Sequence, residues 1–242
     1  MTMNNKQSLY ELLLSEVVPH RNFIFENGVY CAVLPHARYI GEQSFSHSDV
    51  QFIDAPLVEV IAKKAFEGCV SLSGVRLLKQ CHVGKDAFHG CTFLANIDMR
   101  MIKNIDEWSF SGTNLRVVNL EHIAQENIPK QAFSNCHNLT FFKSNSTIIE
   151  KRAFYKCVQL QRVECGKLVR IDERAFGFCV SLSYVGRISK KTKAPPSAFA
   201  DCEYFSSVSQ PKTVHKTSRI REIERESADQ CPQNSEDWTL GL

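Results

Sequence analysis

The residues with the most chemistry to offer are the ten cysteines and eight histidines of this 242-residue chain. Cysteines and histidines at suitable spacing bind zinc, and paired cysteines form disulfides. The spacing here disfavours a metal site, because His82 and His137 directly follow Cys81 and Cys136, and adjacent residues on a strand point to opposite faces. Four cysteines have no metal-ligand spacing, and these are Cys31, Cys81, Cys165 and Cys231.

The other six cysteines obey one rule, because each lies three residues after a phenylalanine. They are Cys69, Cys91, Cys136, Cys157, Cys179 and Cys202. Free cysteine behaves as a small hydrophobic residue and is often buried. We therefore expect a ladder of reduced, packed thiols. Equivalent positions in adjacent coils would also lie within reach of a disulfide, so distance alone leaves oxidation open.

Motifs that carry chemistry in other proteins are not found in the sequence. It has no glycine-rich phosphate loop, no His-Glu-x-x-His, no nucleophile elbow and no dinucleotide fingerprint. We therefore expect neither enzymatic activity nor a cofactor. Two glycosylation acceptor patterns begin at Asn138 and Asn145, and without a secretory signal we interpret them as chance matches.

The cysteine rule is part of a longer repeated motif. The motif reads apolar residue, three mostly polar residues, Ala, Phe, two variable residues, Cys, two more residues, Leu. Near copies begin at Ile61, Val83, Ile128, Ile149 and Ile171, and degenerate copies begin at Ile40, Ile105 and Ala194. The central phenylalanines are 21 to 23 residues apart and are Phe45, Phe66, Phe88, Phe110, Phe133, Phe154, Phe176 and Phe199. In the coils of Phe45 and Phe110, Ser48 and Thr113 replace the cysteine. A period of this length indicates a solenoid.

A second apolar pattern follows each motif and is typical of a short strand. Its copies are LSGVRL from Leu72, LANIDM from Leu94, LRVVNL from Leu115, LTFFKS from Leu139, LQRVEC from Leu160 and LSYVGR from Leu182. Stacked copies would form a parallel sheet with strands about 4.8 Å apart. The Ala-Phe-x-x-Cys segment is too short for a long helix, so we expect one helical turn or an irregular arc.

In these repeats the chain resembles the BspA-like class of leucine-rich repeats (LRR_5-type), over residues from about 29 to 208. The resemblance implies an α/β-type repeat solenoid of about eight repeats, with a parallel β-sheet on the concave face and short helical or irregular arcs on the convex face. It also implies a non-catalytic recognition scaffold. Bacterial surface proteins belong to this class, so a cell-surface adhesin or host-contact protein is the alternative.

Three regions are expected along the chain. Residues 1–39 form an N-terminal cap, with a helix at Ser8 to Val18 and a hairpin at Asn27-Gly28 that leads into the first strand. Residues 40–208 form the solenoid. Residues 209–242 have few apolar side chains and mixed charge, which predicts a polar, disordered tail. Part of this tail could instead form a short helix on a partner or over the last coil.

Composition restricts the partners and the location. The formal net charge of +3 disfavours a nucleic-acid partner. The sequence contains no run of about 18 apolar residues, the length that a membrane-spanning helix requires. The N-terminus has no secretory signal pattern. We therefore expect a cytoplasmic protein, alone or as a subunit of a larger assembly, with the cell surface by an unrecognised route as the alternative.

The candidate binding surface is the exposed side of the predicted sheet. The fifth-position row contains Asp54, Arg76, Asp98, Asn119, Lys143, Glu164 and Gly186. Here we expect a ladder of surface ion pairs that joins Asp54, Arg76 and Asp98, and then Lys143 and Glu164. The third-position row contains Phe52, Gly74, Asn96, Val117, Phe141, Arg162 and Tyr184.

The aromatic residues of the third-position row, Phe52, Phe141 and Tyr184, are expected to face solvent, with Arg162 between the last two. Exposed aromatic side chains beside an arginine have the composition of interface hot spots. The alternatives are that they stack on neighbouring strands or that the register is shifted by one residue. The candidate partner-binding set, for a protein partner of unknown identity, is Phe52, Arg76, Asp98, Asn119, Phe141, Lys143, Arg162, Glu164 and Tyr184.

Overall fold

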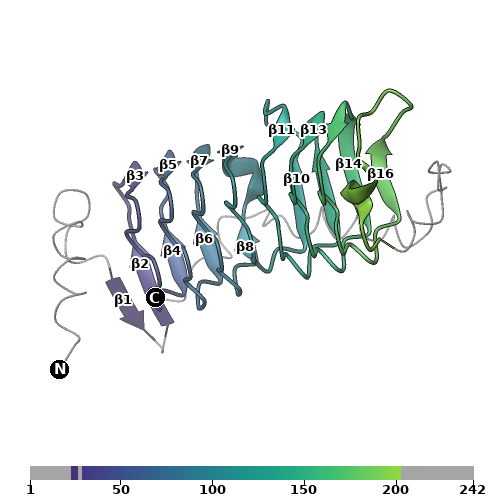
Figure 1. Ribbon diagram of the computed structural model, residues 1–242. Helices are drawn as coiled ribbons and strands as arrows, with labels where there is room; N and C mark the ends of the chain where they lie inside the picture. The colour runs from purple at the N-terminus through teal and green to yellow at the C-terminus, as the bar shows by residue number, and fades with distance from the viewer. Residues whose placement is uncertain (1–22, 27–28, 203–242) are drawn as a thin grey trace, which may run out of the picture.

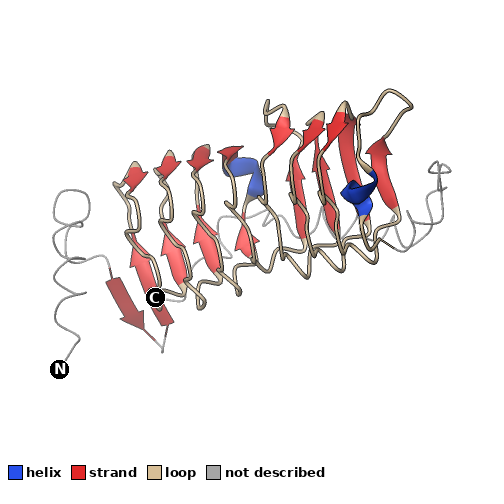
Figure 2. Cartoon of the chain, in the orientation of Figure 1, coloured by secondary structure: helices blue, strands red, loops and turns tan. Residues whose placement is uncertain are grey.

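The computed structural model describes residues 23–26 and 29–202, which wind into a stack of coils (Figure 1). Each complete coil has one strand of a main sheet, a second short strand and an arc of turns (Figure 2). The predicted helix at Ser8 to Val18, the turn residues Asn27 and Gly28, and the predicted tail lie outside the described residues.

The main sheet consists of two sections that follow each other along the solenoid (Figure 1). The first section has the order β1 (Phe23–Glu26), β2 (Val29–Val33), β4 (Phe52–Asp54), β6 (Gly74–Arg76), β8 (Asn96–Ile97). The second has the order β10 (Val117–Leu120), β12 (Phe141–Ser144), β14 (Arg162–Lys167), β16 (Tyr184–Arg187). All neighbours are parallel except β1 and β2, which are antiparallel. The predicted parallel sheet is thereby confirmed.

A second row of short parallel strands runs beside the main sheet and was not predicted. One section contains β3 (Tyr39–Ile40), β5 (Val60–Ile61), β7 (Cys81–Val83) and β9 (Ile102–Ile105). The other contains β11 (Asn127–Ile128), β13 (Ile148–Ile149) and β15 (Arg170–Ile171). Each of these seven strands ends at the apolar residue that opens the repeated motif, and this side chain is buried in all seven. The opening residue therefore belongs to a strand rather than to the arc.

The arcs are irregular and almost without helix. In the described residues the helical segments are two short 3₁₀ turns, η1 (Met99–Met101) and η2 (Pro196–Phe199). From the coil of Phe45 to that of Phe176, the backbone of each arc is left-handed two residues before and two residues after the phenylalanine, as at Lys64 and Gly68. Arc amides are paired between coils, since the Phe66 N–H donates to the Ala87 carbonyl at 2.8 Å. The arcs therefore satisfy their buried backbone groups as a third ladder.

The eight repeat phenylalanines form one continuous column through the core. Neighbouring rings are stacked with centroids 5.1 to 5.8 Å apart, from Phe45 at one end to Phe199 at the other. Offset stacking at this separation is a favourable arrangement for aromatic pairs. Since each ring contacts the rings before and after it, the column joins every coil to its neighbours.

The six cysteines of the motif are buried beside this column, and their thiols are free. Each thiol donates to the carbonyl of a phenylalanine in the preceding coil, as from Cys91 Sγ to Phe66 O at 3.0 Å. Thr113 stands at the same position of the motif, but its hydroxyl donates to the Phe110 carbonyl of its own coil and contacts the Cys136 sulfur of the next coil at 3.4 Å. The predicted packed ladder of thiols is confirmed, and its hydrogen bonds explain why serine and threonine can replace the cysteine.

The break in the second row of strands, between β9 and β11, is closed by a glutamine side chain. Gln125 Nε2 donates to the Ile105 carbonyl at 2.9 Å, and its Oε1 accepts from the Ile105 N–H at 3.1 Å. The side-chain amide thus supplies the two hydrogen bonds that a neighbouring strand would make. Because Ile105 is only 1% exposed, water is a poor substitute for this amide.

Replacing Gln125 by leucine is expected to lower the free energy of unfolding by about 2 kcal/mol, because both backbone groups of Ile105 lose their partner. Urea denaturation followed by circular dichroism measures the change. The matched control is Gln159→Leu, which removes only an exposed bond to Asn138 and is expected to cost less than about 0.5 kcal/mol. Equal losses in the two variants would show that the Gln125 amide does not hold the break together.

Candidate functional site

The outer face of the main sheet brings the predicted third-position row together. Backbone register aligns Phe52 with Gly74 and Gly74 with Asn96 in the first section. In the second section it aligns Val117, Phe141, Arg162 and Tyr184. The predicted rows are therefore correct within each section of the sheet.

The predicted exposure of Phe141 is wrong, since only 4% of this residue is accessible. A shifted register is not the cause, because the adjacent Phe142 points into the core and packs edge-on against Phe133 and Phe154. Phe141 lies between Val117 and Arg162 in the row. Aligned side chains on parallel strands are about 4.8 Å apart, so long side chains in one row can cover one another.

Arg162 also differs from the prediction, because it is only 7% exposed. Its guanidinium carbon lies 4.2 Å from the centroid of the Tyr184 ring, and its Nε donates to Glu164 at 2.8 Å. The guanidinium therefore stacks on the Tyr184 ring. Tyr184 itself is partly exposed.

At the other end of the sheet, Phe52 is partly exposed and lies over Gly74. A Cβ at position 74 would be 2.9 Å from the nearest carbon of the Phe52 ring. Glycine therefore makes room for the ring against the sheet. Between the two partly exposed aromatic residues, Asn96 and Asn119 are exposed.

The fifth-position row contains ion pairs, but only one of those predicted. Arg76 donates to Asp54 at 2.8 Å, as expected. Asp98 pairs with Arg100 at 2.7 Å rather than with Arg76, and Lys143 pairs with Glu121 at 2.9 Å rather than with Glu164.

The ion-pair prediction compared only equal positions on neighbouring strands. It therefore missed Arg100 and Glu121, and it missed the pairing of Glu164 with Arg162. Residues two apart on one strand share a face, and this rule would have found the Arg162 and Glu164 pair. Asn119 has a local role, because its side chain accepts from the Glu121 N–H at 3.0 Å.

Two thiols outside the ladder, those of Cys81 and Cys165, have low reactivity. Burial raises the pKa of the Cys81 and Cys165 thiols to about 12, and a thiol that stays protonated is a poor nucleophile. Within the described residues, no group of three or more His, Cys, Asp or Glu side chains is placed to hold a metal ion. The described part of the chain also contains no helix long and apolar enough to cross a membrane.

Comparison with known proteins gives one family. The family described as "BspA type Leucine rich repeat region" matches residues 29–140 and 126–220, with six copies of the repeat. None of the curated proteins matches the chain.

Several solved structures are similar to the chain. A leucine-rich repeat protein from T. pallidum is 18% identical, with 86% of this chain and 94% of that chain covered and a TM-score of 0.48. A leucine-rich repeat protein from Bacteroides ovatus is 19% identical, with 72% of this chain and 59% of that chain covered and a TM-score of 0.49. One from Eubacterium ventriosum is 19% identical, with 82% and 54% covered and a TM-score of 0.46.

Proposed function

The chain belongs to the BspA-type leucine-rich repeat family, and from this premise we propose that it is a non-catalytic scaffold that binds a protein partner through the outer face of the main sheet. The repeat builds a rigid, extended surface without adding a catalytic group. In repeat proteins such surfaces are commonly used for binding.

The observation that carries this proposal is the mixed composition of the outer face. Phe52 and Tyr184 are partly exposed near its two ends, and Asn96 and Asn119 are exposed between them. The Arg76 and Asp54 pair and the Lys143 and Glu121 pair add charge of both signs. Aromatic anchors within a polar, charged surround are typical of protein interfaces.

One edge of the main sheet, at β2, is covered by another strand, which leaves the outer face of the sheet as the surface for binding. β1 pairs antiparallel with β2 over the whole of β1, so β2 does not offer an open parallel edge to another chain. At this end of the sheet a partner is therefore expected to bind across the strands, through side chains, rather than to add a strand to β2.

Membership of the family supports a second candidate, cell-surface adhesion or host contact, since BspA-type repeats occur in surface proteins. The same sheet face would then bind a partner outside the cell. Surface biotinylation of intact cells distinguishes the two, because an intracellular scaffold is labelled only after lysis and an adhesin is labelled before it.

Replacing Asn96 by arginine tests the sheet face directly. The longer, charged side chain is expected to weaken partner binding at least about tenfold, because it enters the middle of a fitted interface. The measurement is a pull-down from native lysate followed by affinity measurement with the recovered protein, using variants whose circular dichroism is unchanged.

The matched control is Asn104→Arg, since Asn104 is also an exposed strand residue and lies in β9 of the second row. This variant is expected to keep the partner. If both variants recover the same partner with equal affinity, the main sheet face is not the binding surface.

A further inference from the structure

A group of basic and aromatic residues lies on the arcs of the coils that contain Phe154 and Phe176, apart from the main sheet face. We define the basic aromatic cluster as Arg152, Tyr155, Lys156, Arg174 and Phe178. The Tyr155 and Phe178 rings meet edge to face with centroids 5.5 Å apart. The Arg152 guanidinium carbon and Lys156 Nζ lie 5.5 Å and 5.6 Å from the centroid of the Tyr155 ring.

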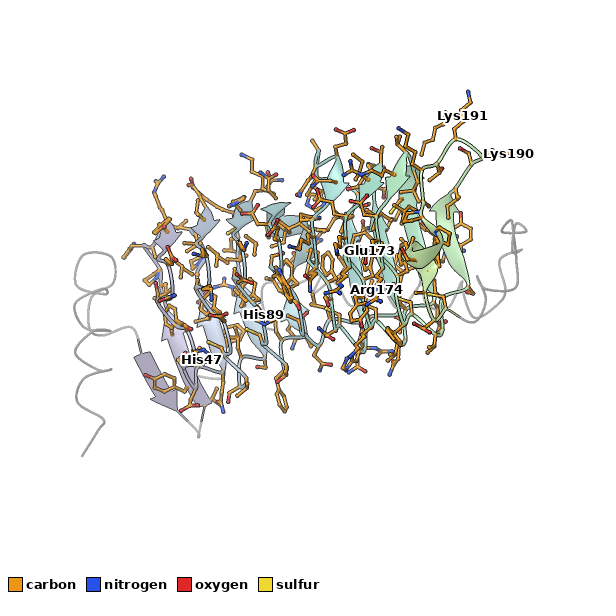
Figure 3. All side chains as sticks on the ribbon, viewed as in Figure 1. His47, His89, Glu173, Arg174, Lys190 and Lys191 are labelled. Atoms are coloured by element: carbon orange, nitrogen blue, oxygen red, sulfur yellow. The ribbon has the colours of Figure 1, made fainter. Side chains whose placement is uncertain are left out.

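The three cations of this cluster have no carboxylate partner at ion-pair distance among the described residues. Arg152 and Arg174 occupy the same position in adjacent coils, two residues before the phenylalanine, so like charges are neighbours and repel. The Arg152 Nε is buried and has no hydrogen-bond partner in the structure. Glu173 lies beside Arg174 (Figure 3) and pairs with Lys151 at 2.8 Å. Lys151, and to a smaller extent Arg174 and Arg152, lower the pKa of its carboxyl group, so Glu173 partly offsets the positive charge at this side of the cluster.

Some residues of the cluster have a backbone conformation that is unfavourable for residues other than glycine. Lys156 and Phe178 have φ angles of 61° and 63°, a region that suits glycine and that bulky side chains rarely adopt. Three earlier coils have glycine at this position, namely Gly68, Gly90 and Gly112. The fold therefore has a less strained solution that these two coils do not use, and the coils with His47, Asn135 and Asp201 at this position do not use it either.

Gly177 shows that the cluster is built around the Tyr155 ring. A Cβ at position 177 would lie 3.0 Å from this ring, so a larger residue would push the ring away from Phe178. The structure does not require a positive φ at Gly177. Its role is to leave room for the aromatic pair, which places a flat apolar patch between the cations.

We propose that the basic aromatic cluster docks an acidic segment of a partner protein. Carboxylates of the segment pair with Arg152, Lys156 and Arg174, and an apolar or aromatic side chain packs on Phe178. The positive region is short. Asp172 lies in the coil of Phe176 and Asp201 lies in the coil of Phe199, and their negative charges end the region. A few cations beside an aromatic pair fit a few carboxylates, whereas a nucleic acid requires a longer basic track.

The test uses the full chain and a fluorescein-labelled peptide of four Glu-Glu-Tyr units, with fluorescence anisotropy as the readout. The double variant Lys156→Glu with Arg174→Glu is expected to weaken peptide binding at least about tenfold, because two favourable pairs become repulsive. Both residues are exposed and already left-handed, so the replacements keep the same backbone strain.

The matched control is Lys190→Glu with Lys191→Glu, which makes the same change in net charge on an exposed loop away from Arg174 (Figure 3). This variant is expected to change the affinity less than about twofold, since charges separated by more than a Debye length are largely screened at physiological salt. Equal weakening in both double variants would overturn the proposal, because it would reflect net charge alone.

Two further results would overturn the proposal. Equal affinity for a peptide of Gln-Gln-Tyr units would show that carboxylates are not recognised. Tighter binding of an oligothymidylate of similar length, lost in the Lys156→Glu with Arg174→Glu variant, would assign the cluster to nucleic acid instead. Neither result would affect the proposed binding on the main sheet face, which lies on other residues.

Discussion

Replacing Phe133 by alanine is expected to lower the free energy of unfolding by about 4 kcal/mol. Phe133 is fully buried and stacks between Phe110 and Phe154 at centroid distances of 5.7 Å and 5.8 Å. It also packs edge-on against Phe142 at 5.2 Å. Alanine would leave a cavity in the middle of the solenoid and remove three ring contacts.

The control for this substitution is Phe93→Ala, because Phe93 is 65% exposed and its loss is expected to cost less than about 0.5 kcal/mol. Phe133→Leu separates volume from stacking, since leucine fills most of the space without a ring and is expected to cost about 2 kcal/mol. Urea denaturation followed by circular dichroism gives all three values. Similar losses for Phe133→Ala and Phe93→Ala would contradict the view that the column holds the coils together.

Hydrogen exchange adds a spatial prediction for Phe133→Ala. In a repeat protein each coil is stabilised mainly by its two neighbours. Amide protection is therefore expected to fall first in the coils of Phe110, Phe133 and Phe154, and less at the ends of the solenoid. A uniform loss of protection would instead indicate that the whole stack unfolds as one unit.

The fold was predictable because its strongest signals are periodic. The repeat phenylalanines recur every 21 to 23 residues, and in most copies a cysteine follows three residues later, as Cys69 follows Phe66 and Cys91 follows Phe88. In the structure these residues form one aromatic column and one ladder of thiols. A side chain that must contact its own copy in the next coil is restricted in type. Such positions can be identified from the sequence without knowing the path of the backbone between them.

The parts that were not predicted depend on single residues instead of the period. The second row of strands is only two residues long in several coils, such as Val60–Ile61, which is too short for an alternating pattern to appear. The bridge by Gln125 depends on one side chain that replaces a strand. The left-handed arc residues include lysine, aspartate and tryptophan as well as glycine, so residue type did not reveal them.

For the candidate binding surface, the sequence predicted which residues share a row but not how far each is exposed. The row order follows from the register of parallel strands, which the repeat determines. Exposure depends on the side chains next in the row, and the neighbours of Phe141 are Val117 and Arg162. Consequently Phe141 is buried where its place in the pattern alone predicted a solvent-facing ring.

The second large effect is expected from alkaline pH, because burial raises the pKa of the thiols in the core. The affected residues are Cys69, Cys81, Cys91, Cys136, Cys157, Cys165, Cys179 and Cys202. For Cys136 the pKa rises from 9.0 to about 11. Below about pH 9 the thiols are protonated in the folded and unfolded states alike, so their full contribution to stability is present.

Above about pH 9 the thiols of the unfolded chain ionise first, while the buried thiols stay protonated. Each such thiol lowers the free energy of unfolding by about 1.4 kcal/mol per pH unit, until the pH passes its pKa in the folded protein. Several thiols act together, so we expect the urea midpoint to fall steeply above about pH 9 and the fold to be lost by about pH 11. The measurement is urea denaturation at intervals of about half a pH unit.

Cys136→Ser separates this effect from the titration of lysine and tyrosine, which is common to both proteins. The hydroxyl fits the ladder, because Ser48 and Thr113 occupy equivalent positions and contact the next thiol. At pH 8 the variant is expected to be less stable by about 1 kcal/mol, owing to the weaker packing of a buried hydroxyl. Between pH 8 and 11 the difference should shift by about 2 kcal/mol in favour of serine, because only cysteine has a thiol to ionise in the unfolded chain. If the two proteins instead lose stability in parallel over this range, the Cys136 thiol ionises as readily in the folded state as in the unfolded one, and the ladder is open to water.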